Sequence, residues 1–186
     1  MSRLRLAIQG GPCSFSHQAA RTLLEQAEDD IHYRFLAGFP EVLNELMQGH
    51  ADAVLLPVEN SHIGPIPGIQ DLLKKSRLVH RASLWLPVRH CLVGLPGADE
   101  SALRTVHSHP AALAQCQQFL SQHPKLQAVE EEDTANSLSL LRVRGQGNAA
   151  AIASVQAACF HGLPLIRKDI QDQPDNRTHF QLFTAP

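Results

Sequence analysis

Five short segments of the sequence gather hydroxyl, amide and imidazole side chains where predicted strands lead into helices or where a strand begins. In layered α/β proteins, ligands bind beyond the carboxyl ends of strands and close to helix N-termini. Side chains of these types, together with backbone N–H groups, suit a small, polar and anionic ligand. The segments are residues 10–17, 57–62, 107–109, 133–134 and 176–180.

Each segment also has a purely structural interpretation. Ser14, Ser16, Asp133 and Thr134 are residue types that cap helices. The pair Gly10-Gly11 is typical of a plain turn. No GKS or GKT follows that pair, which argues against a phosphate-binding loop. No serine has a GxSxG setting, so a hydrolase nucleophile is not indicated. The residues alone indicate a small-molecule α/β protein with a polar site.

The elements that must position these segments alternate between strand-like and helix-like patterns, which predicts α/β layers with largely parallel strands. A long extended stretch, residues 78–95, has no helix caps, and we expect the chain to cross there from one lobe to another. The predicted strands are 4–9, 31–35, 52–57, 105–108, 126–129, 148–152, 163–168 and 178–183, and the predicted helices are 15–27, 40–47, 69–75, 110–121, 133–144 and 154–160.

Composition narrows the class of protein. The 186 residues suffice for one domain or for two small intertwined lobes. Sixteen Lys and Arg against eighteen Asp and Glu give a net charge of −2, which argues against a nucleic-acid partner. No apolar run approaches the length of a membrane span, and the first apolar stretch is too short for a signal peptide. We therefore expect no membrane partner and a cytoplasmic location.

Cysteine and histidine spacing predicts no metal site. The four cysteines show no CxxC pair, and in a chain with no secretion signal we expect free thiols in a reducing compartment. The eleven histidines are scattered. The closest cluster, His107 with His109, has no ligand-spaced Glu or Cys beside it, and no HExxH occurs.

Taken together, the segments resemble the motifs of prephenate dehydratases. S-F-S-H-Q-A-A at 14–20 is similar to the family's opening [TS]-[FY]-S-x-x-A-A, and P-V-E-N-S at 57–61, followed by D-L-L at 71–73, is similar to P-[IV]-E-N-S…D-L-L. S-H-P-A-A-L-A-Q-C at 108–116 and N-R-T-H-F at 176–180 are similar to S-H-P-x-A-L-x-Q-C and N-x-T-R-F. A further match covers 150–163. The motifs occur in order and span nearly the whole chain.

This resemblance implies a fold, a reaction and an assembly. The implied fold is α/β, two intertwined lobes with mixed, mainly parallel sheets like a type II periplasmic binding protein, and an active cleft between them. Lobe 1 would be about 1–77 plus 163–186, and lobe 2 about 78–162. The implied reaction converts prephenate to phenylpyruvate in phenylalanine biosynthesis, with no cofactor and a homodimer as the usual assembly. Because the sequence stops soon after residue 180, we expect no regulatory ACT domain.

The resemblance also assigns roles to residues. Thr178 aligns with the donor to the leaving hydroxyl, and Asn60, Ser108 and Gln115 match positions that contact substrate or orient that donor. Glu59 is either a supporting carboxylate or an ion-pair partner. The expected substrate-binding residues are Ser14, Phe15, Ser16, Ser61, Thr134, His179 and Phe180.

Three positions depart from the family pattern. Cys13 stands where the family usually has Gly, Ser83 where it has Glu, and His179 where it has the Arg of T-R-F. In a regular strand Thr178 and His179 point to opposite faces. His179 therefore either supplies the positive charge of the missing Arg, when protonated, or faces away from the substrate. An Arg can grip a carboxylate with two parallel hydrogen bonds, which a His cannot.

Three functions stay open at this point. The first is a prephenate dehydratase without ACT regulation, which the retained Thr178 favours. The second is a divergent homologue, either a non-aromatising prephenate decarboxylase or an arogenate dehydratase, which the lost Arg favours. The third is a binding protein for an aromatic acid that has lost catalysis.

Overall fold

The computed structural model describes residues 3–24, 30–131, 134–145 and 147–186, and for residues 134–136 it describes the backbone alone. The chain forms two compact units: unit 1 is Met1–Val88 with Asp175–Pro186, and unit 2 is Arg89–Pro174. Both boundaries lie later in the chain than the predicted 77/78 and 162/163. The reason is strand pairing, because residues 79–87 pair with the last strand of unit 1, and residues 165–167 pair within unit 2.

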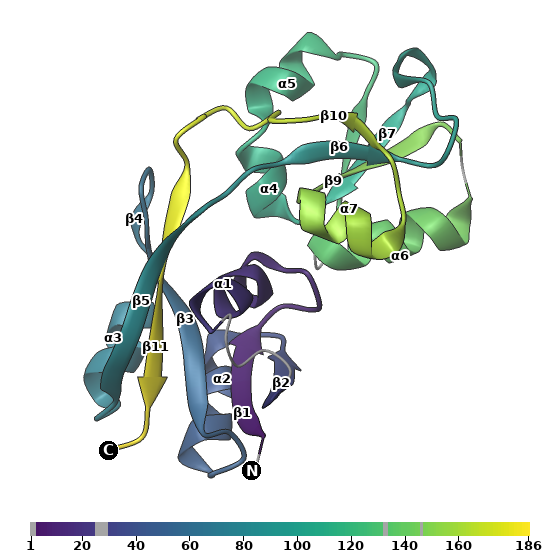
Figure 1. Ribbon diagram of the computed structural model, residues 1–186. Coiled ribbons are helices and arrows are strands. Elements are labelled where there is room, and N and C mark those ends of the chain that lie inside the picture. Colours follow the sequence, from purple (N-terminus) through teal and green to yellow (C-terminus); the bar gives the residue numbers. More distant parts are fainter. Residues whose placement is uncertain (1–2, 25–29, 132–133, 146) are drawn as a thin grey trace. The chain divides into compact units, whose positions relative to one another are not determined.

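Unit 1 is built on a mixed sheet with the strand order β2-β1-β3-β11-β5, and β4 pairs with β3 (Figure 1). The pairs β1–β2 and β1–β3 are parallel, whereas β11 runs antiparallel to both β3 and β5. The bounds are β1 Leu4–Gln9, α1 Phe15–Leu23, β2 Ile31–Leu36, α2 Phe39–Met47, β3 Ala53–Asn60, β4 Gly64–Pro65, α3 Ile69–Lys75, β5 Val79–Pro87 and β11 Arg177–Thr184.

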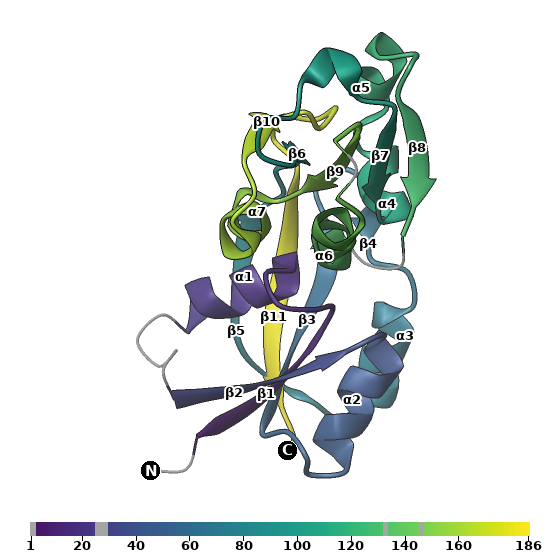
Figure 2. The ribbon, with the colours of Figure 1, turned by 90° about the vertical axis from the view of Figure 1, so that its right-hand side faces the viewer.

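Both faces of this sheet are covered, so its central strands are buried along most of their length. Helix α1 covers one face, and α2 and α3 cover the other (Figure 2). Alternation along β1 follows the period of two expected for a strand: Leu6 and Ile8 pack on the α1 side, and Ala7 packs on the α2 side. The near-continuous apolar run of β3 is typical of a central strand covered on both faces.

Unit 2 carries a second mixed sheet with the order β10-β6-β9-β7-β8. Strand β7 is parallel to β8 and β9, while β6 is antiparallel to β9 and β10. The antiparallel pairings of β6 and β11 make the two sheets less parallel than the sequence indicates. The bounds are β6 Cys91–Gly94, the short 3₁₀ helix η2 Glu100–Ala102, β7 Thr105–Ser108, α4 Pro110–Ala114, α5 Gln117–Gln122, β8 Gln127–Glu130, α6 Thr134–Arg144, β9 Ala149–Ala153, α7 Val155–His161 and β10 Leu165–Arg167.

One predicted helix, residues 110–121, is divided in the structure into α4 and α5. The carboxylate of Asp172 accepts hydrogen bonds from the backbone N–H groups of Gln117 and Gln118, at 3.0 and 2.9 Å. A carboxylate on free N–H groups is a helix N-terminal cap, so a new helix begins there. The capping residue is 54 positions away in sequence from Gln118, which is why the local pattern does not reveal the break.

Two further sequence expectations concern helix ends and membrane association. The predicted helix 15–27 is helical to Leu23, and its last residues lie outside the described part of the chain. Asp133, one of two predicted N-caps for α6, also lies outside it. Among the helices that the structure describes, none is both long enough and apolar enough to cross a membrane.

Candidate active site

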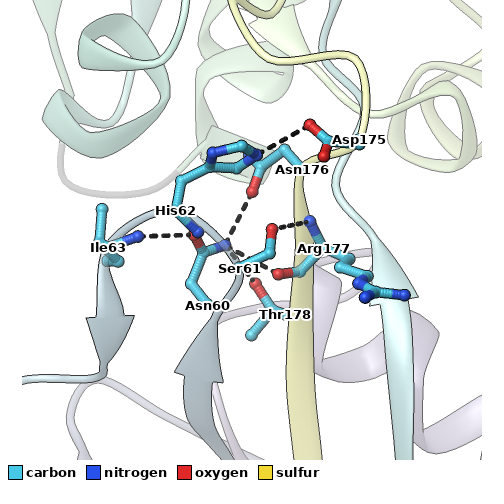
Figure 3. A network of polar contacts seen from close by, with 8 residues as sticks. All are labelled: Asn60, Ser61, His62, Ile63, Asp175, Asn176, Arg177 and Thr178. Atoms are coloured by element: carbon cyan, nitrogen blue, oxygen red, sulfur yellow. Dashed lines mark hydrogen bonds and ion pairs between the residues drawn. The ribbon is translucent and has the colours of Figure 1, made fainter.

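The junction of β3 and β11 in unit 1 joins two of the predicted catalytic residues. Asn60 and Thr178 lie directly opposite each other in the antiparallel pair, so their side chains share a face of the sheet. The Asn60 amide nitrogen Nδ2 lies 3.1 Å from Thr178 Oγ1, 3.1 Å from the carbonyl oxygen of Arg177 and 2.8 Å from Asn176 Oδ1 (Figure 3). The two motifs that contain these residues are 118 positions apart in sequence.

The orientation of the Asn60 amide is fixed by backbone groups on its other side. Its oxygen Oδ1 accepts hydrogen bonds from the backbone N–H groups of His62 and Ile63, at 3.0 and 3.3 Å. An amide whose oxygen faces donors must direct its NH₂ group at the acceptors. Asn60 therefore donates to Thr178 Oγ1, and the Thr178 hydroxyl is left with its own hydrogen to donate in another direction.

These groups are shielded from water. Asn60 is 4% exposed, Asn176 5% and Thr178 8%. Hydrogen bonds are electrostatically stronger in such surroundings, and a lost partner is correspondingly costly. Asn176 was not among the residues predicted for the site, although it begins the N-x-T motif that contains Thr178. Its position in that motif is the sequence feature that could have identified Asn176 as part of the site.

Solvent-exposed contacts also connect the end of β3 with the beginning of β11. The backbone N–H of Ser61 donates to the carbonyl of Arg177 at 2.9 Å, and the Arg177 N–H donates to Ser61 Oγ at 3.0 Å. His62 Nε2 lies 3.0 Å from Asp175 Oδ1. Ser61 was predicted to bind substrate, and in the structure its hydroxyl accepts a bond that holds the β3–β11 junction.

The neighbouring residue on β11, His179, has different surroundings. Its ring is stacked on Trp85 of β5, with centroids 4.8 Å apart and an interplanar angle of 11°. The Arg177 guanidinium carbon lies 5.0 Å from the centre of the same indole ring. Glu59, opposite His179 in β3, is exposed. The alternation of a strand puts this cluster on the face opposite Thr178.

Phe180 belongs to the core of unit 1. The residue is 2% exposed and packs among the residues that separate the sheet from α1, with Phe15 at the margin of the same cluster. Both phenylalanines were predicted to bind substrate. In the structure Phe180 is a packing residue beneath Thr178, because residues 178 and 180 share a face of β11.

The loop between β1 and α1 holds the other predicted binding residues of unit 1. Ser14 caps α1 by accepting the N–H of His17 at 3.3 Å, and His17 Nδ1 in turn accepts the N–H of Cys13 at 2.9 Å. Ser16 lies in the first turn of α1 and is buried. The Ser14 hydroxyl therefore has a structural partner in the helix itself.

Cys13 has a backbone conformation that favours glycine. Its φ is +64°, in the left-handed region that glycine adopts most readily. An L-residue in this region costs roughly 1–2 kcal/mol. Burial raises the pKa of its thiol, with Arg21 acting in the opposite direction. The loop thus contains a left-handed turn at a position that is not glycine.

Two predicted catalytic residues lie in unit 2. Ser108, at the end of β7, is fully buried and donates its hydroxyl hydrogen to the carbonyl of Ile152 at 2.8 Å. Gln115, at the end of α4, is half-buried, and its side-chain oxygen lies 2.9 Å from His90 Nε2. His90 is 3% exposed and was not predicted for the site. Thr134 begins α6, and its side chain lies outside the description.

Comparison with known proteins identifies the family. A family model described as prephenate dehydratase matches residues 6–186. The chain belongs to the prephenate dehydratase family. This is a family of lyases, and the match confirms the resemblance on which the site residues were chosen.

Relatives and solved structures support the same placement. The chain is 36% identical to the arogenate dehydratase/prephenate dehydratase 1 of Arabidopsis thaliana, over 96% of this chain and 44% of the relative. It is 32% identical to a bifunctional N-acyl-homoserine lactone acylase/prephenate dehydratase of Komagataeibacter europaeus, over 95% of this chain and 61% of the relative. A prephenate dehydratase from Arthrobacter aurescens, solved in complex with L-Phe, matches 98% of this chain and 61% of its own at 27% identity and a TM-score of 0.87.

These comparisons confirm the predicted fold class. They also show that the chain spans about half the length of the first curated relatives it matches. Because the relatives carry both prephenate and arogenate dehydratase names, membership of the family does not select one of these two substrates.

Proposed function

We propose that this chain catalyses the decarboxylating dehydration of prephenate or of arogenate. The observation that carries the proposal is the direction of the hydrogen bond between Asn60 and Thr178. Because Asn60 donates to Thr178 Oγ1, the threonine hydroxyl serves as a donor. The reaction needs such a donor at the hydroxyl group that leaves the ring.

The chemistry asks little else of the protein. When the bond from the ring to its carboxylate breaks, CO₂ leaves and the electron pair moves into the ring. The ring C–O bond then breaks, and the hydroxyl departs with one added proton as water. Formation of the aromatic ring provides the driving force. A donor at the departing oxygen contributes typically about 10²–10⁴-fold to such a step.

Asn60 strengthens this donor. Negative charge grows on the threonine oxygen as its hydrogen moves toward the leaving group. The N–H of Asn60, 3.1 Å away, is already directed at that oxygen and does not need to reorient. Pre-oriented donors of this kind stabilise developing charge most effectively where water is excluded. A free threonine hydroxyl is a weak acid, so we assign Thr178 a hydrogen-bonding role within a proton relay.

The experiment that tests this function supplies the purified chain with prephenate and, separately, with arogenate. We expect phenylpyruvate from the first or phenylalanine from the second, with release of CO₂. Loss of CO₂ without aromatisation would replace the proposal by the non-aromatising decarboxylase. Binding of either compound without turnover would replace it by the silent binding protein.

An N-acyl-homoserine lactone is a useful comparison substrate, because the Komagataeibacter relative carries an acylase name as well. We expect no cleavage at the Thr178 site. A nucleophile would need a base that accepts its hydrogen, whereas Asn60 donates a hydrogen to it.

We also propose that the chain forms a homodimer, as the resemblance implies, and that it acts in the cytoplasm, as expected from its sequence. Light scattering of the purified chain should then give twice the mass of the 20.4 kDa protomer. Fractionation of producing cells should recover the protein with the cytoplasmic enzymes. A monomer mass, or recovery in another fraction, would contradict the corresponding part of this proposal.

A further inference from the structure

A buried histidine in unit 2 lies against Gln115, a residue that the family resemblance places at a position that contacts substrate or orients the donor. His90 is 3% exposed, and its ring nitrogen Nε2 is 2.9 Å from Oε1 of Gln115. A carbonyl oxygen can only accept, so Nε2 must carry the hydrogen of this bond. The contact therefore fixes the tautomer of His90 and the orientation of the Gln115 amide together.

We infer that His90 is a positioning residue for catalysis, which orients the Gln115 amide so that its NH₂ end is presented as a donor to a substrate oxygen. This inference rests on the proposed function. It concerns a residue that none of the sequence motifs selected, and it assigns His90 no contact with substrate.

The backbone on both sides of the contact is held independently. The carbonyl of Gln115 accepts the N–H of Asp172 at 2.7 Å, at the point where α4 ends. The N–H of His90 donates to Gln171 Oε1 at 2.9 Å, and the carbonyl of His90 accepts the N–H of Ile170 at 2.9 Å. The segment 170–172 thus anchors the backbone of both residues, and the bond between their side chains orients the glutamine amide.

This arrangement lowers the cost of binding. A glutamine side chain that becomes ordered only when the substrate arrives loses up to about 2 kcal/mol of conformational entropy at that moment. Ordering it in advance transfers that cost to folding. Burial lowers the pKa of His90, and the bond to Gln115 opposes this shift less strongly. The ring therefore stays neutral near pH 7, as the single Nε2–H donor requires.

The test is a double-mutant cycle on kcat/KM with whichever of prephenate and arogenate the wild type converts. His90→Leu removes the donor, and we expect kcat/KM to fall about tenfold, because small misplacements of a catalytic contact are costly. His90→Gln keeps an N–H near the position of Nε2 and should recover most of the activity. Gln115→Ala should lose at least as much as His90→Leu.

The decisive comparison is made in the Gln115→Ala background. If His90 acts only through Gln115, adding His90→Leu there changes kcat/KM less than twofold, although it still lowers the melting temperature. A purely structural histidine would lower kcat/KM by the same factor in both backgrounds, and that result overturns the inference. His123→Leu is the matched control, since its ring is also hydrogen-bonded within unit 2, to the carbonyl of Phe119 at 2.7 Å.

A second measurement does not depend on turnover. In protein labelled with ¹⁵N at histidine, the His90 ring should show the Nε2–H tautomer, with a slowly exchanging ring N–H that exchanges faster in Gln115→Ala. The opposite tautomer would refute the inference. If the wild type converts neither substrate, the proposed function fails, and the tautomer and exchange data still decide whether His90 orients Gln115.

Discussion

Neighbouring residues on the two faces of β11 have different surroundings. Thr178 enters a buried polar network with Asn60, whereas His179 is stacked on an indole that is 39% exposed. One peptide bond separates the two residues, and the alternation of the strand separates their surroundings. The first face holds groups whose hydrogen-bond directions are fixed. The second holds an aromatic and cationic cluster in contact with water.

This difference bears on how the chain works without the arginine of the T-R-F motif. A side chain at position 179 begins on the Trp85 face, and to reach a ligand beside Thr178 it must pass around the strand. The donor function, in contrast, depends on Asn60 and Thr178, and both are retained. The comparison therefore predicts large effects for substitutions on the Thr178 face and small effects on the Trp85 face.

The largest effect is expected for Thr178→Ala. The substitution removes a contact that strengthens mainly in the transition state, so kcat should fall by about 10²–10⁴-fold with little change in KM. Thr178→Ser keeps the hydroxyl and should recover most of the rate. Thr184→Ala, on the same strand, is the matched control and should leave kcat unchanged. Near-wild-type turnover by Thr178→Ala would falsify the assigned mechanism.

Asn60→Asp tests the direction of the network with almost no change of shape. It replaces the NH₂ group by an oxygen that faces three acceptor oxygens. We expect the free energy of unfolding to fall by about 2–3 kcal/mol at neutral pH, because a buried donor is lost and like partial charges meet. Urea titration measures this change. Asn44→Asp, at an exposed position of α2, should change stability by less than about 0.5 kcal/mol.

The free energy of unfolding of Asn60→Asp should also depend on pH in a way that reports the orientation of the amide. Burial among oxygens raises the folded-state pKa of a carboxyl at position 60 above its unfolded value. A raised pKa means that the folded state holds its proton more tightly, so the deficit relative to the wild type shrinks as the pH falls through that pKa and grows as the pH rises. A deficit that does not depend on pH would show that the Asn60 amide is not oriented as described.

The sequence predicts the members of the Asn60–Thr178 network better than it predicts how the chain brings them together. The motifs selected Asn60 and Thr178 because their residue types recur in a recognisable order. They did not give the register that places these residues opposite each other across β3 and β11. That register depends on antiparallel pairing between segments more than 100 positions apart, for which local patterns carry no signal.

The other differences between the sequence predictions and the structure also arise from contacts between residues that are distant in sequence or from the packing of whole elements. The break between α4 and α5 depends on Asp172, and the role of His90 depends on a contact 25 positions away in sequence. The burial of Phe180 follows from its alternation with Thr178 on a strand covered by α1. Cys13 is a further difference, because a Cys in place of the family's Gly suggests a differently shaped loop, whereas the structure gives this residue a φ of +64°, in the region that favours glycine.

A double-mutant cycle of Trp85→Ala and His179→Ala measures the interaction energy of the stacked pair on the Trp85 face of β11. Stacked aromatic pairs contribute about 0.5–1.5 kcal/mol beyond the area they bury, and partial exposure of Trp85 favours the lower half of that range. We expect this coupling in the free energy of unfolding, with kcat changed less than about twofold. His80 and Phe183 provide the matched pair, since their rings meet across the same two strands at 5.8 Å. A fall in kcat as large as that of Thr178→Ala would break the distinction between the faces.

The smallest effect is expected for His179→Arg, which restores the residue of the family motif. A guanidinium stacks on an indole about as well as an imidazole does, so Arg at this position can keep the Trp85 contact. We therefore expect KM for prephenate to change by less than about threefold, and His179→Ala, which loses the stack, to behave similarly in KM while losing stability. The other hypothesis is that position 179 provides the charge that binds a substrate carboxylate. It requires His179→Arg to lower KM about tenfold or more, because two parallel hydrogen bonds would replace one. Measuring KM for the wild type and both variants at constant ionic strength separates the two, since only a side chain that reaches around β11 can produce the larger change.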